Sequence, residues 1–370
     1  MSRVASIETL RPRWVEIDIE ALAQNVRTIC NRIGSQVQFY AVCKNDGFGC
    51  GAAEAAVACI ANGADALAVT DPQDAWKIRE AGVIAPVLLF PSTLPVAAEV
   101  VANLGVTPTL HDKPGLEAFA ALRRSLNVFV KVDCGFGRFG FTRKQWREAF
   151  ALLHECTYLR VTGLYCHMDT PEDRDAIARQ TKLCTEAVTD AGAAGLIPRT
   201  LMVASSRVVI GFPELDYSAV NPGRMLFGLL DAPWDRYMEI RPVIRAIKSQ
   251  IIQIKDIEAG SGVGYGRVAQ QKLRTGIIPL GFADGLPREP DRRLALVKGR
   301  RAPLIGMRST EATTLDITDL PDIRLGDEVV LMGQQGDQEI SAATFSGHFN
   351  TPILELLPRL ARSLPRTYRN

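Results

Sequence analysis

The chain has 370 residues, of which 47% are hydrophobic and 23% charged, and its formal net charge is only +2. This composition is ordinary for a globular protein and excludes collagen-like sequence, long disordered tracts and disulfide miniproteins. The near balance of charge argues against nucleic-acid binding, which usually involves a basic domain. At roughly 100–200 residues per domain, the length predicts two domains or one large barrel with an appendage.

The sequence predicts a cytoplasmic, metal-free protein with no membrane association. No uninterrupted apolar run reaches the roughly 18 residues of a membrane span. Residues 1–14 lack the apolar core of a secretory signal. The eight cysteines form no CxxC pair, so we expect reduced thiols rather than a disulfide framework. The histidines show no zinc-ligand spacing, and His111, His154 and His348 are interpreted as surface or packing residues.

Strand and helix patterns alternate from residue 33 to residue 230, after a helix expected at residues 19–33. The expected strands are residues 37–43, 66–69, 86–90, 105–110, 128–132, 161–166, 201–204 and 218–227. Helical periods lie between most of them, at residues 52–61, 73–81, 143–153 and 174–191. Eight strands alternating with helices predict a closed parallel (β/α)8, TIM-like barrel. A doubly wound open sheet is the alternative, but the GxGxxG fingerprint after the first strand is missing.

The residue composition and the predicted secondary structure change after about residue 241. Cysteine disappears, long helices become rare, and Gly and Pro punctuate short strand-like runs. These runs are residues 244–254, 275–280, 294–297, 302–305, 313–317 and 328–332. The pattern predicts a mostly β C-terminal domain, with residues 1–235 forming the barrel and 236–370 the β-rich domain.

Catalytic residues of a (β/α)8 barrel lie at the C-terminal ends of its strands. The residues expected there are Lys44, Lys131, Asp133, His167, Ser205, Ser206 and Asn221. A lysine that ends an apolar strand is unusual. Burial there lowers its pKa, which leaves more of it as the neutral, nucleophilic amine that can attack a carbonyl. The glycines behind Lys44 free backbone amides to face a ligand, most often a phosphate.

Several motifs in order give the chain a resemblance to the alanine racemase family of fold-type III pyridoxal-phosphate enzymes. Residues 41–51 (AVCKNDGFGCG) are similar to the segment around that family's cofactor lysine, and residues 131–140 (KVDCGFGRFG) to its KxDTGMxRxG block. The segments 220–224 (VNPGR) with 226–229 (LFGL), 264–267 (GYGR) and 281–285 (GFADG) match three further blocks. The resemblance covers nearly the whole chain. It implies a barrel followed by a β domain, and a homodimer with shared active sites.

The resemblance implies an amino-acid racemase that would interconvert L- and D-enantiomers with pyridoxal 5'-phosphate. Lys44 would hold the cofactor and act as the base on one face of the substrate's α-carbon. Tyr265, delivered from the partner subunit, would be the opposite base, supported by His167. Racemisation needs a proton removed from one face and returned to the other, so two bases are chemically coherent.

The resemblance also implies the cofactor-binding residues. Arg138 would lie near the cofactor's phenolic oxygen and the substrate carboxylate, where a permanently charged fork fits. Lys131, often carbamylated in the family, would orient that arginine; an ordinary buried ion pair with Asp133 is the alternative. The rest of the cofactor site would comprise Phe48, Ser205, Ser206, Asn221, Gly223, Arg224 and Arg362. Asp284 and Arg288 are placed on the outer side of the pocket.

The sequence departs from the family pattern around the expected site. Asn221 stands where the family has an arginine against the pyridine nitrogen, and Phe48 replaces a phosphate-binding tyrosine. Arg362 falls at or near a second phosphate-contacting tyrosine. Thr310 and Glu311 replace a Met-Asp pair that lies by the substrate carboxylate. The substrate is therefore an amino acid that need not be alanine, and a larger or more polar one is compatible with the changes.

Three alternatives remain open at this stage. The same cofactor could support another reaction on an amino acid, such as decarboxylation or aldol cleavage. The chain could be a non-catalytic pyridoxal-phosphate-binding protein, although such carriers lack a β domain and a counterpart of Tyr265. An unrelated possibility is a cofactor-free barrel aldolase that forms a Schiff base through Lys131.

Overall fold

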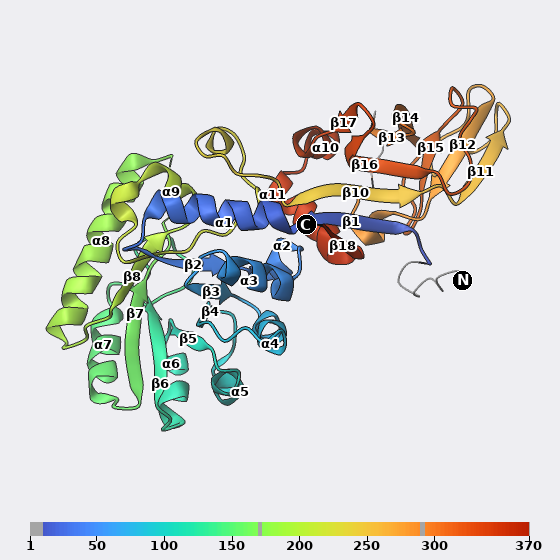
Figure 1. Ribbon diagram of the computed structural model, residues 1–370. Helices are drawn as coiled ribbons and strands as arrows, with labels where there is room; N and C mark the ends of the chain where they lie inside the picture. The colour runs from blue at the N-terminus through green and yellow to red at the C-terminus, as the bar shows by residue number, and fades with distance from the viewer. Residues whose placement is uncertain (1–9, 169–171, 289–292, 370) are drawn as a thin grey trace. The chain divides into compact units, whose positions relative to one another are not determined.

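The computed structural model describes residues 10–168, 172–288 and 293–369 (Figure 1). Within them the chain forms two compact units. One comprises residues 21–241, and the other combines the first strand, up to residue 20, with the residues from 242 onward. The sequence prediction had placed residues 1–235 in one domain, whereas the first strand joins the later residues because it pairs with the strands at residues 244–250 and 366–369.

The first unit is a closed parallel barrel, as the sequence predicted. Its strands pair in the order β2-β3-β4-β5-β6-β7-β8-β9, and β9 pairs with β2 to close it. They are β2 (Gln38–Val42), β3 (Ala66–Val69), β4 (Val87–Leu89), β5 (Thr107–Leu110), β6 (Leu126–Lys131), β7 (Leu159–Tyr165), β8 (Thr200–Ala204) and β9 (Ala219–Val220). The strand expected over residues 218–227 is thus only two residues long, because Pro222 follows it and the chain turns.

Helices alternate with these strands. They are α1 (Ile19–Ile33), α2 (Lys44–Phe48), α3 (Ala52–Ala61), α4 (Pro72–Glu80), α5 (Ala98–Asn103), α6 (Lys113–Ala121), α7 (Trp146–Glu155), α8 (Arg174–Ala193) and α9 (Ser206–Gly211), with 3-10 turns η2 (Pro95–Ala97), η3 (Pro213–Leu215) and η4 (Trp234–Arg236). Three of these helices begin at an aspartate whose carboxylate accepts a backbone N–H: Asp71 for α4, Asp112 for α6 and Asp173 for α8. Such caps satisfy donors that the first turn leaves unpaired.

Aromatic side chains fill part of the barrel. The ring of Phe129 lies 5.8 Å from that of Tyr40 and 6.3 Å from that of Tyr165. Gly163 makes room for this cluster, since a Cβ there would lie 2.4 Å from Phe129 Cζ. The buried Tyr165 hydroxyl is satisfied by Thr109 Oγ1 at 3.1 Å. The barrel is therefore a packed core rather than a pore.

The second unit is built on a ten-stranded sheet of the described residues, ordered β11-β12-β15-β14-β13-β16-β10-β1-β18, with β17 paired to β16. The strands are β1 (Arg13–Asp18), β10 (Ile244–Gln250), β11 (Gln253–Ile257), β12 (Leu273–Ile278), β13 (Leu294–Val297), β14 (Arg300–Ile305), β15 (Thr313–Asp316), β16 (Glu328–Gln335), β17 (Gln338–Ile340) and β18 (Arg366–Arg369). Helices α10 (Ala342–Phe349) and α11 (Ile353–Ser363) and the 3-10 turn η5 (Phe282–Asp284) complete it. The mostly β character was predicted; strands β1, β17 and β18 and helices α10 and α11 were not.

No helix in the described part of the chain is both long enough and apolar enough to span a bilayer.

Candidate active site

The chemically active residues of the barrel gather at the C-terminal ends of its strands, as expected for this fold. Lys44 follows β2 after one residue, Lys131 ends β6, and His167 stands two residues after β7. Ser205 and Ser206 follow β8, and Asn221 follows β9. Because parallel strands present the same ends at one rim, these side chains share one mouth of the barrel.

Lys44 opens a turn of left-handed backbone. Asn45, Asp46 and Gly47 have φ values of 56°, 54° and 62°, and Phe48 has 51°. Three of these four residues carry a Cβ, for which the left-handed region costs on the order of 1 kcal/mol or more each. Such strain persists only where the surroundings fix it, and here it lies in the turn that follows β2 and begins at Lys44.

Buried carboxylates hold this turn. The Asp46 N–H donates to Asp74 Oδ2 at 2.9 Å, and Asp46 Oδ1 accepts from the Ala52 N–H at 3.2 Å and from Lys77 Nζ at 3.1 Å. Burial raises the pKa of Asp74 above its ordinary value. Neither aspartate was singled out from the sequence, since only the position of Asp46 beside the lysine distinguished it.

The loop after β6 is folded around Asp133. Its carboxylate accepts the backbone N–H groups of residues 135, 136 and 137 at 2.8–3.1 Å. The loop closes where the Phe141 N–H donates to Lys131 O and the Asp133 N–H donates to Phe141 O, each at 2.9 Å. Gly140 permits this closure, because a Cβ there would lie 2.7 Å from the Val132 carbonyl carbon. The Asp133 carboxylate thus serves the loop backbone, and the simple Lys131–Asp133 ion pair considered as an alternative is not formed.

This loop presents Arg138 on an aromatic support. The guanidinium carbon lies 4.5 Å from the ring centre of Phe136 and 5.9 Å from that of Phe139. The Phe136 ring in turn meets His167 edge to face at 5.0 Å. Stacking restricts a long side chain without neutralising it, so Arg138 keeps its charge available for an anion. Phe136, which supports the Arg138 side chain, was not singled out from the sequence.

The site is strongly electropositive. Burial, followed by the charges of Lys131, Arg138, Lys44 and Arg224, lowers the pKa of His167 to about 3, so its imidazole is neutral at ordinary pH. Burial and then Arg138 lower the pKa of Lys44. Burial lowers the pKa of Lys131 to about 8, and its Nζ lies 4.7 Å above the Tyr165 ring. A mouth with this excess of positive charge fits an anionic ligand.

A small cradle lies beside these cations. The buried Ser206 Oγ accepts the N–H groups of Gly223 at 3.0 Å and Met225 at 3.2 Å. A Cβ at Gly223 would lie 3.2–3.3 Å from the Phe48 ring, so the chain passes close beneath that ring. Hydroxyl and backbone N–H donors next to lysine and arginine form a donor set suited to a phosphate. Arg224 is half-buried beside Asp231, with 3.5 Å between Nη1 and Oδ2.

Asn221 and Phe48, the two residues that differ from the expected arginine and tyrosine, are both buried at the barrel mouth. Asn221 is buried at the end of β9, and its N–H donates to Ala204 O at 2.8 Å. Phe48 is buried, with its ring centre 5.1 Å from that of Phe227. At the Asn221 position an amide can donate or accept a hydrogen bond, whereas an arginine can only donate.

The second unit holds the other predicted residues in adjoining turns. The Met307 N–H donates to Tyr265 O at 3.2 Å, which ties the GYGR turn to the segment that leads to Thr310 and Glu311. The Ala283 N–H donates to Thr310 O at 2.9 Å, and a Cβ at Gly281 would meet that same oxygen at 2.5 Å. The Tyr265 side chain itself is 58% exposed.

Asp284 anchors this region. It is buried and forms ion pairs with Arg11 at 2.7 Å and Arg13 at 2.8 Å, and Arg11 also reaches Glu311 Oε1 at 3.2 Å. The Asp284 carbonyl accepts from Ser363 Oγ. The two arginines were missed because they precede Asp284 by more than 270 residues.

Arg288 and Arg362 occupy the margin of the same unit. The guanidinium carbon of Arg288 lies 5.7 Å from the Phe282 ring centre. Arg362 is exposed in the last turn of α11.

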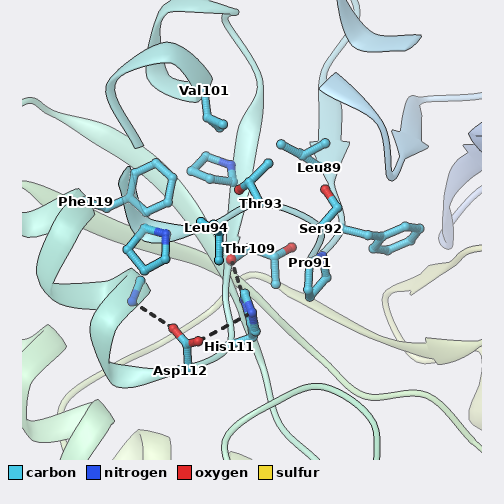
Figure 2. Close-up of a pocket in the computed structure, with 14 residues that line it drawn as sticks. Leu89, Pro91, Ser92, Thr93, Leu94, Val101, Thr109, His111, Asp112 and Phe119 are labelled. Carbon is cyan, nitrogen blue, oxygen red and sulfur yellow. Dashed lines mark hydrogen bonds and ion pairs between the residues drawn. The ribbon is translucent and has the colours of Figure 1, made fainter. Parts of the chain in front are cut away.

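A separate small pocket lies at the ends of β4 and β5 (Figure 2). His111 lines it, with Nε2 3.7 Å from Asp112 Oδ2 and the ring edge-on to Phe139 at 5.9 Å. Asp112 is committed to the start of α6, where it accepts the Gly115 N–H at 2.8 Å. None of the residues singled out for catalysis lines this pocket.

Comparison with known proteins places the chain in a family. Residues 17–231 match the alanine racemase N-terminal domain, and residues 244–368 match the alanine racemase C-terminal domain. An alanine racemase from Nostoc sp. is 30% identical over 366 residues, covering 95% of each chain, and one from Symbiobacterium thermophilum is 31% identical over 372 residues, covering 98% of each.

Solved structures agree with these matches. The alanine racemase from Bacillus anthracis with bound L-Ala-P has a TM-score of 0.90 at 25% identity, covering 97% of this chain and 95% of that one. The alanine racemase from E. faecalis has a TM-score of 0.88 at 25% identity, covering 99% and 100%. With both domains matched in order along nearly the whole length, the chain belongs to the alanine racemase family of amino-acid racemases.

Proposed function

We propose that this protein racemises an amino acid with pyridoxal 5'-phosphate, using Lys44 and Tyr265 as the two bases. The observation that carries the proposal is Lys44 itself. It is a half-buried amine with a lowered pKa, fixed on a strained turn at the barrel mouth beside Arg138 and the Ser206 cradle.

The cofactor fits the residues present. Lys44 would hold its carbonyl carbon, and the Ser206 hydroxyl with nearby backbone amides would hold its phosphate. Arg138 would face its phenolic oxygen, and Asn221 its ring nitrogen. When bound, pyridoxal phosphate delocalises the negative charge that develops on the substrate's α-carbon.

The proton transfers then fall to this chain's own side chains. A lowered pKa leaves more of Lys44 as the neutral amine that accepts a proton. Arg138, charged and stacked on Phe136, would bind the substrate carboxylate and orient the α-carbon. Tyr265 would serve the opposite face, where its hydroxyl gives or takes the second proton.

We further propose that Tyr265 acts from a second copy of the chain in a homodimer. In support, its aromatic side chain is largely exposed within its own unit, and no hydrogen bond to its hydroxyl occurs among the described residues. A large exposed aromatic with a polar tip is typical of a group that completes a site on a partner.

Lys131 is the basis of an additional proposal, namely that it is carbamylated. Carbamylation consumes a neutral amine, and a pKa of about 8 makes that form available. The product would carry a negative charge near Arg138, replacing repulsion by attraction. A 13C resonance that appears with labelled bicarbonate and vanishes in Lys131→Gln would support the proposal; its absence from the wild type would refute it.

The relatives named alanine racemase make alanine the first substrate to test, and the changes at Thr310 and Glu311 call for larger and polar amino acids beside it. The experiment incubates the purified holoenzyme with each L-amino acid in D2O, followed by proton NMR and chiral chromatography. We expect deuterium at the α-carbon together with the D-enantiomer. Carbon dioxide or an aldehyde as the product would instead favour decarboxylation or aldol cleavage, and no exchange with any amino acid would favour a cofactor carrier.

Borohydride reduction followed by peptide mass spectrometry checks the cofactor lysine independently. We expect a stable adduct on Lys44 without added substrate. An adduct that forms only with a carbonyl substrate and lies on Lys131 would point to the cofactor-free aldolase instead.

A further inference from the structure

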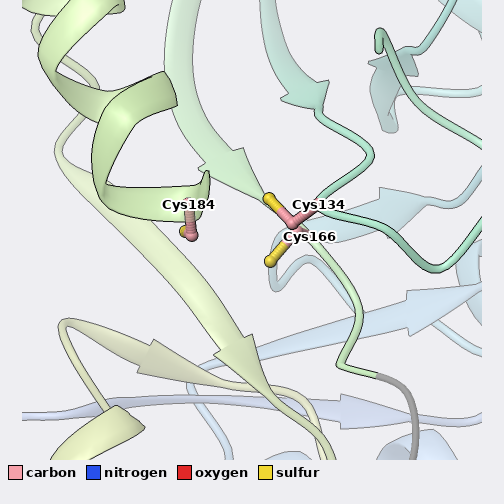
Figure 3. Close-up of side chains that lie close together, drawn as sticks. All are labelled: Cys134, Cys166 and Cys184. Atoms are coloured by element: carbon pink, nitrogen blue, oxygen red, sulfur yellow. The ribbon is translucent and has the colours of Figure 1, made fainter. Parts of the chain in front are cut away.

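Three buried cysteines of the barrel unit lie close together (Figure 3). Cys134 comes from the loop after β6, Cys166 from the end of β7, and Cys184 from the middle of α8. Their sulfur atoms all lie within 4.8 Å of one another, and each residue is only 1% exposed. In the described part of the chain this is the one cluster of three His, Cys, Asp or Glu ligands with this geometry.

The spacing of the sulfurs suits a metal ion. With metal–sulfur bonds of about 2.3 Å, a three-coordinate site places its sulfurs roughly 4 Å apart. The three thiols need only a small contraction to reach that arrangement, and none is engaged in a disulfide. Because all three sulfur atoms lie within 4.8 Å of one another, a single ion can contact all of them.

The surroundings suit the charge that such a site would carry. Lys131 is close by, since the charges of Cys134 and Cys166 act on it directly. Bound thiolates are anions, which need compensating positive charge when they are removed from water. Lys131 supplies it as the free ammonium, not as the carbamate proposed above.

We propose that Cys134, Cys166 and Cys184 form a buried binding site for a soft monovalent ion of the Cu(I) class. Thiolates favour such ions. Zn²⁺ fits less well, because it takes four ligands and this buried cluster offers three with no access for a water molecule. Each thiol that binds releases its proton to solvent, the ion takes its place, and no oxidation state changes.

The proposal is tested by metal transfer rather than by catalysis, so it stands or falls independently of the racemase activity. The reduced holoenzyme is titrated without oxygen against the coloured Cu(I)–bicinchoninate complex, and bound copper is counted after desalting. We expect one copper per chain in the wild type. We expect Cys184→Ala to lose it, and alanine is tolerated in the middle of α8 because it is a strong helix former.

Two other cysteine variants serve as matched controls. Cys156→Ala removes a half-buried thiol outside the cluster. Cys59→Ala removes a buried thiol that neighbours Cys43, and these two cysteines form the competing sulfur site. Both are expected to keep the copper. Cys134→Ser provides a second cluster variant should Cys184→Ala fail to fold.

Several outcomes would overturn the proposal. Copper that stays with bicinchoninate in the wild type would show that the cysteines act only as small apolar packing residues. Copper retained in both cluster variants would exclude the site. Copper lost in Cys59→Ala but kept in Cys184→Ala would assign the binding to the other pair.

Discussion

Lys131 shows how one buried side chain links stability to pH. Its pKa in the folded chain is about 8, against an ordinary value of 10.5, because burial disfavours its charge. Between these values the unfolded chain binds a proton that the folded chain has released, so the free energy of unfolding rises with pH. Below pH 8 both states are protonated, and the folded state bears the full penalty of the buried charge.

We therefore expect Lys131→Met to stabilise the chain at pH 7 by up to about 3 kcal/mol, with the gain fading as the pH approaches 10.5. Urea unfolding in carbonate-free buffer at pH 7 and pH 10 measures this difference. Lys182→Met, which removes an exposed lysine of α8, is the control and should change stability little at either pH. A gain for Lys131→Met that is equal at both pH values would contradict the explanation.

Two glycine substitutions separate close packing from helix propensity. Gly223→Ala would place a Cβ 3.2–3.3 Å from the Phe48 ring and from Val42 Cβ, so we expect a loss of about 1–3 kcal/mol and weaker retention of pyridoxal phosphate. Gly192→Ala adds a methyl group in α8 with no atom within 4 Å, so we expect a gain of about 0.5–1 kcal/mol. Urea unfolding and cofactor absorbance report both effects; similar stabilities for the two variants would be inconsistent with the packing described.

At the scale of elements, the left-handed turn after Lys44 depends on Asp46. Asp46→Ala removes the acceptor for the Ala52 N–H and for Lys77, so we expect a loss of about 1–3 kcal/mol and reduced cofactor retention. Asp71→Ala removes a helix cap outside the turn, and we expect a loss of about 1 kcal/mol with cofactor retention intact. Equal cofactor retention in the two variants would mean that the turn does not position Lys44.

The elements that the sequence predicted well are those whose pattern is local. The barrel strands are continuous apolar runs, and α1 shows a clear helical period, so neither needs knowledge of distant residues. Strand β1 could not be predicted from its local pattern alone, because it pairs with β10 and β18, which are more than 200 residues away in the sequence. The helices α10 and α11 were missed because the Pro and Gly punctuation of the preceding strands set the expectation for the whole region.

The candidate site divides in the same way. Lys44, Lys131 and His167 could be placed from strand ends alone, because the barrel fold fixes where those ends meet. The left-handed turn, the Asp133-centred loop and the Arg11–Asp284 anchor depend on hydrogen bonds that no sequence period encodes. The cysteine cluster escaped notice because its members lie in three separate elements and show no ligand spacing.

At the scale of the whole molecule, the proposed dimer predicts that two inactive variants can restore each other's activity. If Tyr265 acts on the partner's Lys44 site, a hybrid of Lys44→Ala and Tyr265→Ala chains contains one intact site. Equal co-expression should then restore about a quarter of the wild-type activity, since half of the dimers are hybrids and each has one working site of two.

The controls for this mixture are simple. Each variant expressed alone should be inactive. When the two purified dimers are mixed, the mixture should stay inactive until the subunits exchange between dimers. If the mixture remains inactive after exchange, both bases belong to one chain and the subunit arrangement is wrong.

The two-base account is tested most directly by measuring α-deuterium uptake from D2O for each enantiomer separately, in the wild type and in Tyr265→Phe. With Tyr265 as the base on one face only, the variant should lose racemisation by about 10²–10⁴-fold. It should lose exchange with one enantiomer while keeping exchange with the other, because Lys44 still serves its own face. Equal exchange of both enantiomers, reduced or unchanged, would contradict a division of labour between Lys44 and Tyr265.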